Sequence, residues 1–177
     1  MADIDAVRVD NFKESLRQAN RYLALGLFSS LFLLALSFDP AAFGSGSVPL
    51  PGGLPSVPVR YALSMLALVY WVSPFLADFS LARAERIGLQ LQQSNLELLK
   101  AALTFPCIAT TRVHGPRWIT ALVPPILVST AGWANGFFSF SQEAIFLFAL
   151  SVVPYLVLFA FRLRRAIGGL EPDSHGD

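Results

Sequence analysis

The sequence offers very little chemistry for a catalytic or metal site. It contains one cysteine, Cys107, and two histidines, His114 and His175, so an internal disulfide or a thiolate metal cage cannot form within one chain. It has no Gly-x-Ser-x-Gly elbow, no His-Glu-x-x-His, no phosphate-binding loop and no dinucleotide-binding glycine pattern. We therefore expect no catalytic residues, no metal and no cofactor, and we predict that the protein is not an enzyme.

Charge is also scarce, at 14% of the residues with a net charge of +1. This near balance lacks the basic excess that phosphate binding needs, which argues against a nucleic-acid partner. In contrast, 54% of the residues are hydrophobic and the mean hydropathy is +0.56. A soluble domain of 177 residues could not bury so many apolar side chains. The composition therefore indicates an integral membrane protein whose first partner is the lipid bilayer.

Four apolar stretches are long enough to cross a hydrocarbon core of roughly 30 Å. They predict an all-α, integral membrane four-helix bundle with spans at 22–38, 61–81, 118–138 and 143–162. Asn11 and Glu14 have the spacing of a capping box, which predicts that the first helix begins there, before the membrane. Residues 1–21 are then a cytoplasmic helix start, 22–163 the membrane domain and 164–177 a cytoplasmic tail.

Basic residues are sorted to one side of these spans. Of the thirteen Lys and Arg residues, only Arg60 falls on the other side. Cytoplasmic flanks retain basic residues during insertion. The pattern therefore predicts that both termini are cytoplasmic and that the chain lies in the inner (cytoplasmic) membrane of a bacterium.

The predicted outer loop, 39–60, is nearly uncharged and holds five prolines and four glycines. This composition rules out helix and predicts no regular strand. The loop is either a proline-stiffened cap on its own helices or a surface that senses a ligand or partner outside the cell. Composition alone does not separate these interpretations.

The cytoplasmic segment 82–117 begins with a predicted amphipathic helix. Between Leu81 and Leu103 no residue except the isolated Gly88 is a strong helix breaker, so the second span should extend without a break into the cytoplasm. One narrow polar face holds the candidate partner-facing residues Arg86, Gln90, Gln93, Glu97 and Lys100. This helix either packs on its own chain or the headgroup layer, or it docks copies of itself or a cytoplasmic partner. Pro106 and Gly115-Pro116 should break the connector that follows.

Two polar residues are candidates within the membrane. Asp78 lies at the inner end of the second span, where a carboxylate is costly unless it reaches the interface or a cation. It is either functional or part of a structural ion pair with Arg21, Arg83 or Arg117. Asn135, near the outer end of the third span, is expected to hydrogen-bond between helices.

Prolines and small residues mark candidate hinges and packing contacts. Proline frees a backbone carbonyl that a neighbouring group must satisfy inside a bilayer. The candidate hinges are Pro74, Pro124, Pro125 and Pro154. Small residues four apart allow helices to approach closely, and the two such pairs are Gly132 with Gly136 and Gly26 with Ser30. Both patterns also occur in membrane helices that neither bend nor associate.

The distribution of predicted structure favours one function. Because the structured mass outside the membrane is cytoplasmic, we predict a non-enzymatic inner-membrane subunit that self-associates, senses or anchors at the membrane, and presents a cytoplasmic helix to a partner protein. One alternative is a pore or channel, including a membrane-depolarising effector of a bacterial defence or toxin system, which the proline kinks suggest. The other is an accessory subunit of a transport or lipid-modifying complex.

Overall fold

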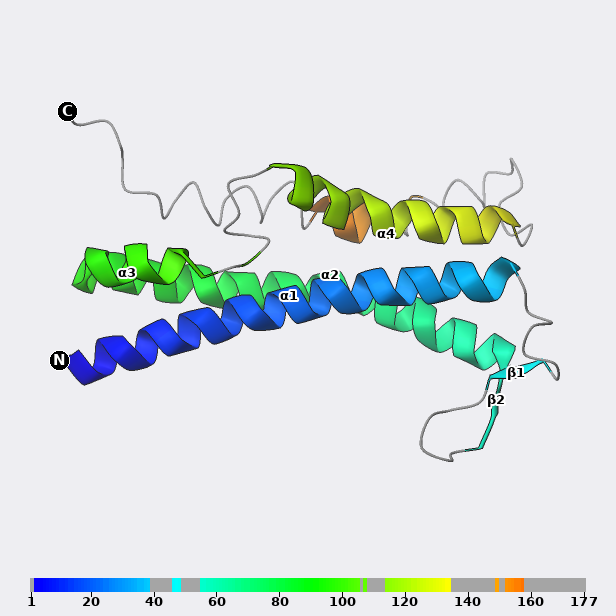
Figure 1. The fold of residues 1–177 in the computed structure, drawn as a ribbon, viewed down its shortest axis with the longest axis horizontal. Helices are drawn as coiled ribbons and strands as arrows, with labels where there is room; N and C mark the ends of the chain where they lie inside the picture. Colours follow the sequence, from blue (N-terminus) through cyan, green and yellow to red (C-terminus); the bar gives the residue numbers. More distant parts are fainter. Residues whose placement is uncertain are drawn as a thin grey trace.

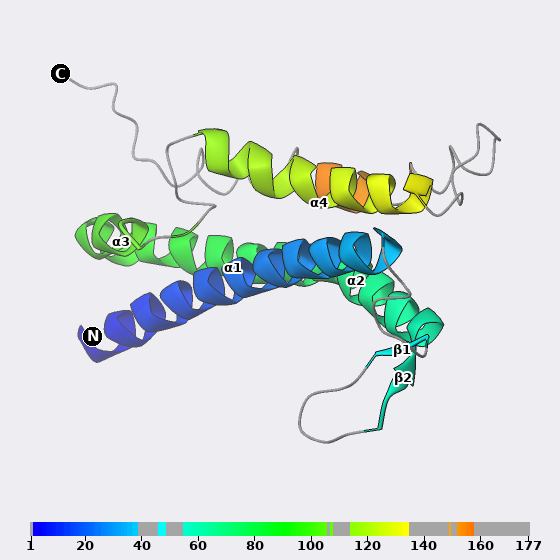
Figure 2. The same cartoon turned by 45° about the vertical axis from the view of Figure 1, so that its right-hand side comes forward.

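The computed structural model describes residues 2–38, 46–48, 55–105, 107, 114–134, 149 and 152–157, and nearly all of them are helical. The elements in chain order are α1 (Ala2–Phe38), β1 (Ser47–Val48), β2 (Val57–Pro58), α2 (Val59–Ser94), α3 (Leu96–Leu103) and α4 (His114–Ala134). Residues 152–157 form a further helical segment. Figures 1 and 2 show α1 and α2 lying side by side, with α4 along α1 and 152–157 beside α4. The all-α prediction is confirmed.

α1 begins nearer the N-terminus than the sequence predicts. The helix runs from Ala2 without a break, so Asn11 lies inside it, and the predicted capping box is wrong. The Asn11 carbonyl instead accepts a hydrogen bond from Ser15 Oγ at 2.8 Å. No glycine or proline precedes Asn11, so nothing in the backbone stops the helix there. The ion pair between Arg8 and Asp5, at 3.1 Å, adds a small contribution on its surface.

α1 and α2 form an antiparallel pair whose register is defined by two contacts. At one end Ser94 Oγ donates to Asp5 Oδ1 at 3.3 Å, and further along Gly26 lies directly against Ser73. The segments from Asp5 to Gly26 and from Ser73 to Ser94 are equal lengths of helix. The register therefore persists over about six turns.

This register aligns the charged halves of the two helices. In this register residues 2–21 of α1 lie beside residues 78–94 of α2, and the uncharged residues 22–38 and 61–77 follow at the other end of the pair, where the first part of α2 slopes away from α1 (Figure 1). We call residues 2–21, residues 78–94 and α3 together the charged arm. The uncharged halves point away from it.

The connection between α1 and α2 contains a short β-ladder, which contradicts the prediction of no regular strand. β1 and β2 pair antiparallel, with Val48 opposite Val57. Gly46 before β1 has a φ of 65°, which costs glycine little, and its carbonyl accepts a hydrogen bond from Val59 N at 2.8 Å. A ladder of two residues per strand tolerates Pro58 because the proline stands at the end of an edge strand.

α2 bends and ends earlier than predicted. In Figure 1 its first part slopes away from α1 and its second part lies along α1. Pro74 lies inside the helix, and the backbone hydrogen bond lost there accounts for the bend. The helix ends at Ser94, and Asn95 is extended, with φ −158° and ψ 93°. The predicted unbroken helix through 82–103 is therefore wrong: the Asn95 side chain accepts a hydrogen bond from Leu98 N at 3.2 Å and caps α3 instead.

α4 packs against α1. Gly115 and Pro116 lie in its first turn, so the prediction that they break the connector is wrong. Proline is tolerated there because a backbone N–H in the first turn has no partner within the helix. The predicted span 118–138 is helical throughout its described part, and the predicted span 143–162 is described only in part.

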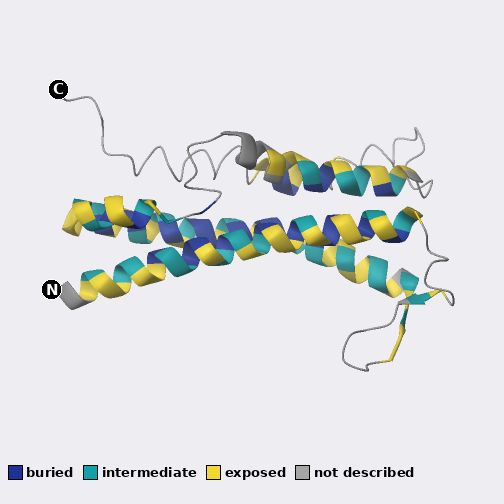
Figure 3. Cartoon of the chain, in the orientation of Figure 1, coloured by how far each residue is buried: buried dark blue, intermediate teal, exposed yellow. Residues whose placement is uncertain are grey.

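Two of the described helices, Ile4–Phe38 and Tyr61–Ser94, are long and apolar enough to cross a membrane, by length and composition alone. A shorter apolar stretch, Leu122–Trp133, lies in α4. In the most apolar 18-residue stretch of each helix, 33% is buried within the chain for the first helix and 22% for the second. Figure 3 shows why: buried positions concentrate where α1 meets α2, and exposed positions run along the rest of both helices.

Candidate functional site

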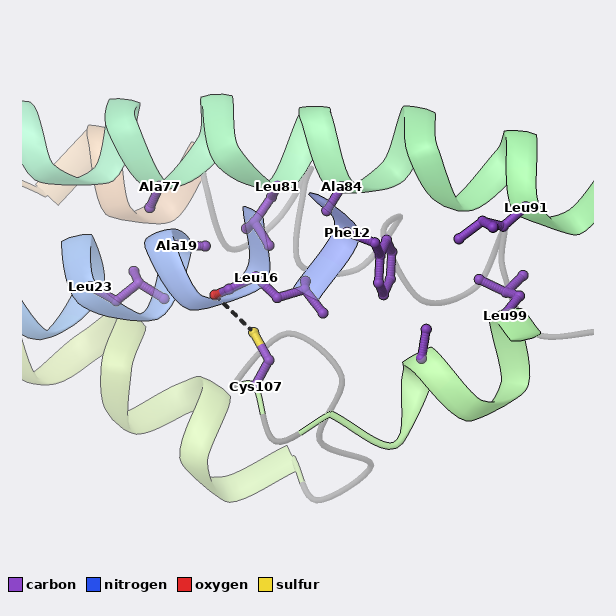
Figure 4. Close-up of a cluster of buried hydrophobic side chains, with 11 residues drawn as sticks. Phe12, Leu16, Ala19, Leu23, Ala77, Leu81, Ala84, Leu91, Leu99 and Cys107 are labelled. Carbon is purple, nitrogen blue, oxygen red and sulfur yellow. Dashed lines mark hydrogen bonds between the residues drawn. The ribbon is translucent and has the colours of Figure 1, made fainter. Parts of the chain in front are cut away.

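The charged arm has an apolar core of its own. Its core side chains are each at most 4% exposed and come from α1, α2, α3 and a residue four positions beyond α3, with two of them in the adjoining turns of the uncharged halves: Phe12, Leu16, Ala19, Leu23, Ala77, Leu81, Ala84, Leu91, Leu99, Ala102 and Cys107. Figure 4 shows these side chains converging between the helices. Burying one Leu or Phe side chain contributes roughly 1.5–3 kcal/mol. The arm therefore buries one apolar face of each of its helices within the chain, while Ile4, Val7, Phe79 and Leu89 stay exposed.

Cys107 closes the base of the arm. Its Sγ donates to the Leu16 carbonyl at 3.7 Å and to Asn20 Oδ1 at 3.3 Å. Close by, the Arg17 guanidinium lies 5.6 Å from the centroid of the Phe105 ring, a distance suited to a cation–π interaction. Both contacts hold the chain beyond α3 against α1. The chain therefore reverses direction at the tip of the arm and returns along α1.

The candidate partner-facing residues remain on the surface of this arm. Arg86, Gln90 and Gln93 are exposed on α2, whereas Glu97 and Lys100 are exposed on α3. The break after α2 means that these five residues do not share one helix face. Lys100 Nζ forms an ion pair with Glu97 Oε1 at 3.0 Å within α3. The polar surface is thus divided between two helices that meet at the tip.

Asp78 stands at the boundary between the charged arm and the uncharged half of α2. It is half-buried, and the antiparallel register places it at the level of Arg21, which is exposed. Arg83, another of its predicted partners, is exposed on α2, and the side chain of Arg117 lies outside the described part. Asp78 therefore sits at the level of Arg21, the last charged residue of α1.

A second cluster of polar groups lies in the uncharged half, at Pro74. An N–H at this position would donate to the carbonyl four residues back, that of Tyr70, and proline has none to give. Ser73 Oγ donates to this carbonyl at 3.0 Å, and the Tyr155 hydroxyl donates to it at 3.3 Å. The two hydroxyl oxygens are themselves 3.0 Å apart. The carbonyl freed by the proline is therefore satisfied by two hydroxyl groups, one of them from the 152–157 segment.

Gly26 supplies the space that this cluster occupies. A Cβ at Gly26 would collide with the Tyr155 hydroxyl and with Ser73 Oγ, and would lie 3.4 Å from Ser73 Cβ. Ser73 and Tyr155 are each 1% exposed. α1, α2 and the 152–157 segment thus meet at one tightly packed polar point.

The tyrosines of this cluster escaped the sequence analysis. The rings of Tyr70 and Tyr155 stack with centroids 5.1 Å apart and an interplanar angle of 25°, and Leu33 of α1 packs with both. A usable signal was present, because Tyr70 stands four residues before Pro74 and is the residue whose carbonyl that proline releases. Which distant side chain would reach it could not be read from spacing.

The remaining predicted hinge and packing residues are only partly described. Pro124 and Pro125 are buried inside α4, where Ser129 Oγ donates to the Pro125 carbonyl at 2.6 Å, and Pro154 is buried in the 152–157 segment. Ser30 is buried one turn after Gly26, and its Oγ donates to the Leu27 carbonyl at 2.7 Å. Gly132 is half-buried, and Asn135 and Gly136 lie outside the described residues.

Within the described residues, no three His, Cys, Asp or Glu side chains come together as a metal site requires. Comparison with protein-family models, with curated proteins and with solved structures finds no match for this chain. The charged arm and the polar cluster at Pro74 are therefore the features of this chain that bear on its function.

Proposed function

We propose that the chain is an integral membrane protein of four spans with both termini in the cytoplasm. At about 1.5 Å per residue, each uncharged half of the α1–α2 pair is about 26 Å long, close to the roughly 30 Å of a hydrocarbon core. The low buried fraction of both helices suits contact with lipid, because a soluble protein of this size rarely exposes so many large apolar side chains. The basic residues on the charged arm favour the cytoplasmic side for it.

In this membrane, we propose, the protein is a non-enzymatic subunit that presents the charged arm to a cytoplasmic protein. The observation that carries the proposal is the arm's buried core, which joins α1, α2 and α3 and reaches the uncharged halves only at Leu23 and Ala77. A core of this kind makes a preorganised surface, and preorganisation lowers the entropic cost of binding. The partner surface consists of Arg86, Gln90, Gln93, Glu97 and Lys100. We also propose that the uncharged halves self-associate through their exposed apolar side chains.

Site-specific photocrosslinking in cells tests the proposed surface. A photoreactive amino acid at Gln90, which is exposed on the arm, should give a discrete crosslinked species with a cytoplasmic protein. Combining Arg86→Ala, Gln93→Ala and Glu97→Ala should lower the yield of that species about tenfold, since removing a central contact of an interface costs of the order of 1–2 kcal/mol.

The matched control replaces exposed polar residues of the same arm outside this surface. Asp10→Ala and Asn11→Ala on α1 should leave the crosslink at Gln90 unchanged. Recovery of the protein as a monomer with no crosslinked species, or an equal loss in the control, would refute the proposed surface. Crosslinks between two copies through the uncharged halves would support self-association alone.

A further inference from the structure

We infer that the Tyr155 hydroxyl sets the angle of α2 at Pro74, so that the position of the 152–157 segment controls a hinge in α2. The inference concerns the conformation of the chain itself and does not depend on the proposed partner. It begins from the Tyr70 carbonyl, which Pro74 leaves without its helical donor. We call Ser73 Oγ, the Tyr155 hydroxyl and this carbonyl the hydroxyl latch.

The two donors of the latch have different origins. Ser73 belongs to α2 itself, so its 3.0 Å hydrogen bond travels with the helix whatever the other elements do. Tyr155 reaches the same carbonyl from a segment 85 residues away in sequence. Only this second hydrogen bond depends on how the elements are arranged. The satisfaction of the carbonyl is therefore linked to the position of the 152–157 segment.

Water has little room to replace the Tyr155 hydroxyl. Both hydroxyl-bearing residues are 1% exposed, and the glycine at position 26 leaves space for the two oxygens but for nothing larger. Without Tyr155 the Tyr70 carbonyl would keep only the Ser73 donor, in surroundings that offer no water in exchange. Departure of Tyr155 should therefore change the angle at which the proline-containing turn is most stable.

The latch lies between two parts of α2 that carry different structures. Before Pro74, the first half of α2 contacts β1 and β2; after it, the second half belongs to the charged arm. The stacked rings of Tyr70 and Tyr155, with centroids 5.1 Å apart, add a second contact across the same point. A displacement of the 152–157 segment is thereby converted into a change of angle between the β-ladder and the arm.

Electron–electron distance measurements on the full-length chain in lipid nanodiscs test the inference. Spin labels at Met65 and Gln93, both exposed, bracket the hinge in a Cys107→Ala background. Tyr155→Phe keeps the ring and removes the hydroxyl, and it should shift and broaden the Met65–Gln93 distance distribution. A second label pair, Asp10 with Gln93, lies within the arm, and its distribution should not change.

A proline replacement distinguishes a latch from general packing. Pro74→Ala restores the N–H that donates to the Tyr70 carbonyl, so adding Tyr155→Phe to it should cause no further change. Should Tyr155→Phe alone be unstable, Ser73→Ala removes the hydroxyl that the Tyr155 hydroxyl contacts at 3.0 Å, and it too should shift the Met65–Gln93 distribution. Its control is Ser80→Ala, because Ser80 is also buried but donates only within its own helix, to the Leu76 carbonyl at 2.9 Å.

The inference is overturned if the Met65–Gln93 distribution of Tyr155→Phe superimposes on that of the parent. It is equally overturned if the effect of Tyr155→Phe persists undiminished in the Pro74→Ala protein. Broadening of both label pairs together would mean that the arm has come apart, and it too would exclude a hinge at Pro74.

Discussion

Gly26 has no Cβ, and this lets α1, α2 and the 152–157 segment approach one another closely. Gly26→Ala would place a Cβ against two hydroxyl oxygens, and overpacking of this kind typically costs about 1–3 kcal/mol. We expect that loss of stability in the otherwise unaltered chain. In a Ser73→Ala, Tyr155→Phe background the same substitution should cost less, because the new Cβ then meets mainly Ser73 Cβ at 3.4 Å. Reversible unfolding in mixed micelles measures all four proteins as a double-mutant cycle.

The control for this cycle adds apolar volume at a position of α1 that faces outward. Ala24 is exposed, and Ala24→Val should change stability by no more than about 0.5 kcal/mol. Strict additivity of Gly26→Ala with the two hydroxyl deletions would contradict the contact between them.

Residue spacing in the sequence identified Gly26 and Pro74 at this contact but did not identify Tyr155. Gly26 and Ser30 were recognisable as a small-residue pair, and Pro74 as a source of a free carbonyl, because both are properties of one helix. The residue that completes the cluster, Tyr155, follows the α2 residues by more than eighty positions. Its role depends on how two helices meet in space, which local pattern does not encode. The five arm residues were likewise recognisable as polar, but their division between α2 and α3 was not.

Among the elements, α3 depends on a single asparagine. Asn95→Ala removes the side-chain oxygen that accepts from Leu98 N at 3.2 Å, and loss of such a cap costs about 0.5–2 kcal/mol. We expect faster hydrogen exchange at the amides of α3, with α1 and α2 unchanged. Gln93→Ala, at an exposed position two residues earlier, should leave exchange in α3 as it is. If the amides of α3 exchange at the same rate in Asn95→Ala as in Gln93→Ala, the cap does not stabilise α3.

α3 is also anchored to the arm by one fully buried leucine. Leu99 is 0% exposed within the arm's core, and truncation of a buried leucine to alanine costs about 2–5 kcal/mol. Leu99→Ala should therefore make α3 sensitive to limited proteolysis. The half-buried neighbour Leu98 supplies the control, and Leu98→Ala should be cut more slowly. The Leu33, Tyr70 and Tyr155 cluster is separate from this core, so the uncharged halves should stay protected in both proteins.

Element length was easier to predict than element boundaries. Long apolar runs made α1 and α2 recognisable, since few other structures accommodate them. The start of α1 was misplaced because Asn11 has the right chemistry for a cap but no reason to interrupt a helix that can continue. The turn at Asn95 was missed because asparagine is only a weak helix breaker. Tertiary contacts of Leu91 and Leu99 decide that the chain turns there.

For the whole molecule, the proposed orientation predicts which ends of the helices are reachable from outside the cell. In a Cys107→Ala background, a single cysteine at Ser56, which is exposed beside β2, should react in intact cells with a maleimide that cannot cross membranes. A cysteine at Gln93 on the charged arm should react only after permeabilisation. The reverse pattern would invert the orientation, and the same response at both sites in intact cells would place them on one side of the membrane and contradict the proposed topology.

The positions of Lys and Arg in the sequence predicted this orientation, but they did not predict how the helices of the arm pack against one another. The same basic residues suit an arm that lies on headgroups or one that stands away from them. Phe12 and Leu91 are both buried in the arm's core, and charge sorting gives no sign of that packing. α1 and α2 continue without a break from the uncharged halves into the arm, so the length of these helices sets the length of the arm.

The bend at Pro74 determines how far the β-ladder moves when the angle of α2 changes. The ladder sits at the beginning of α2, about 22 Å from the proline at about 1.5 Å per residue. A rotation of about 10° there would carry it sideways by about 4 Å, several times the rise of one residue. Pro74 therefore divides α2 unequally. The shorter part, before the proline, adjoins the ladder, and the longer part, after it, packs along α1 (Figure 1). With the inferred hinge at Pro74, a displacement of the ladder would change the angle between the two parts of α2.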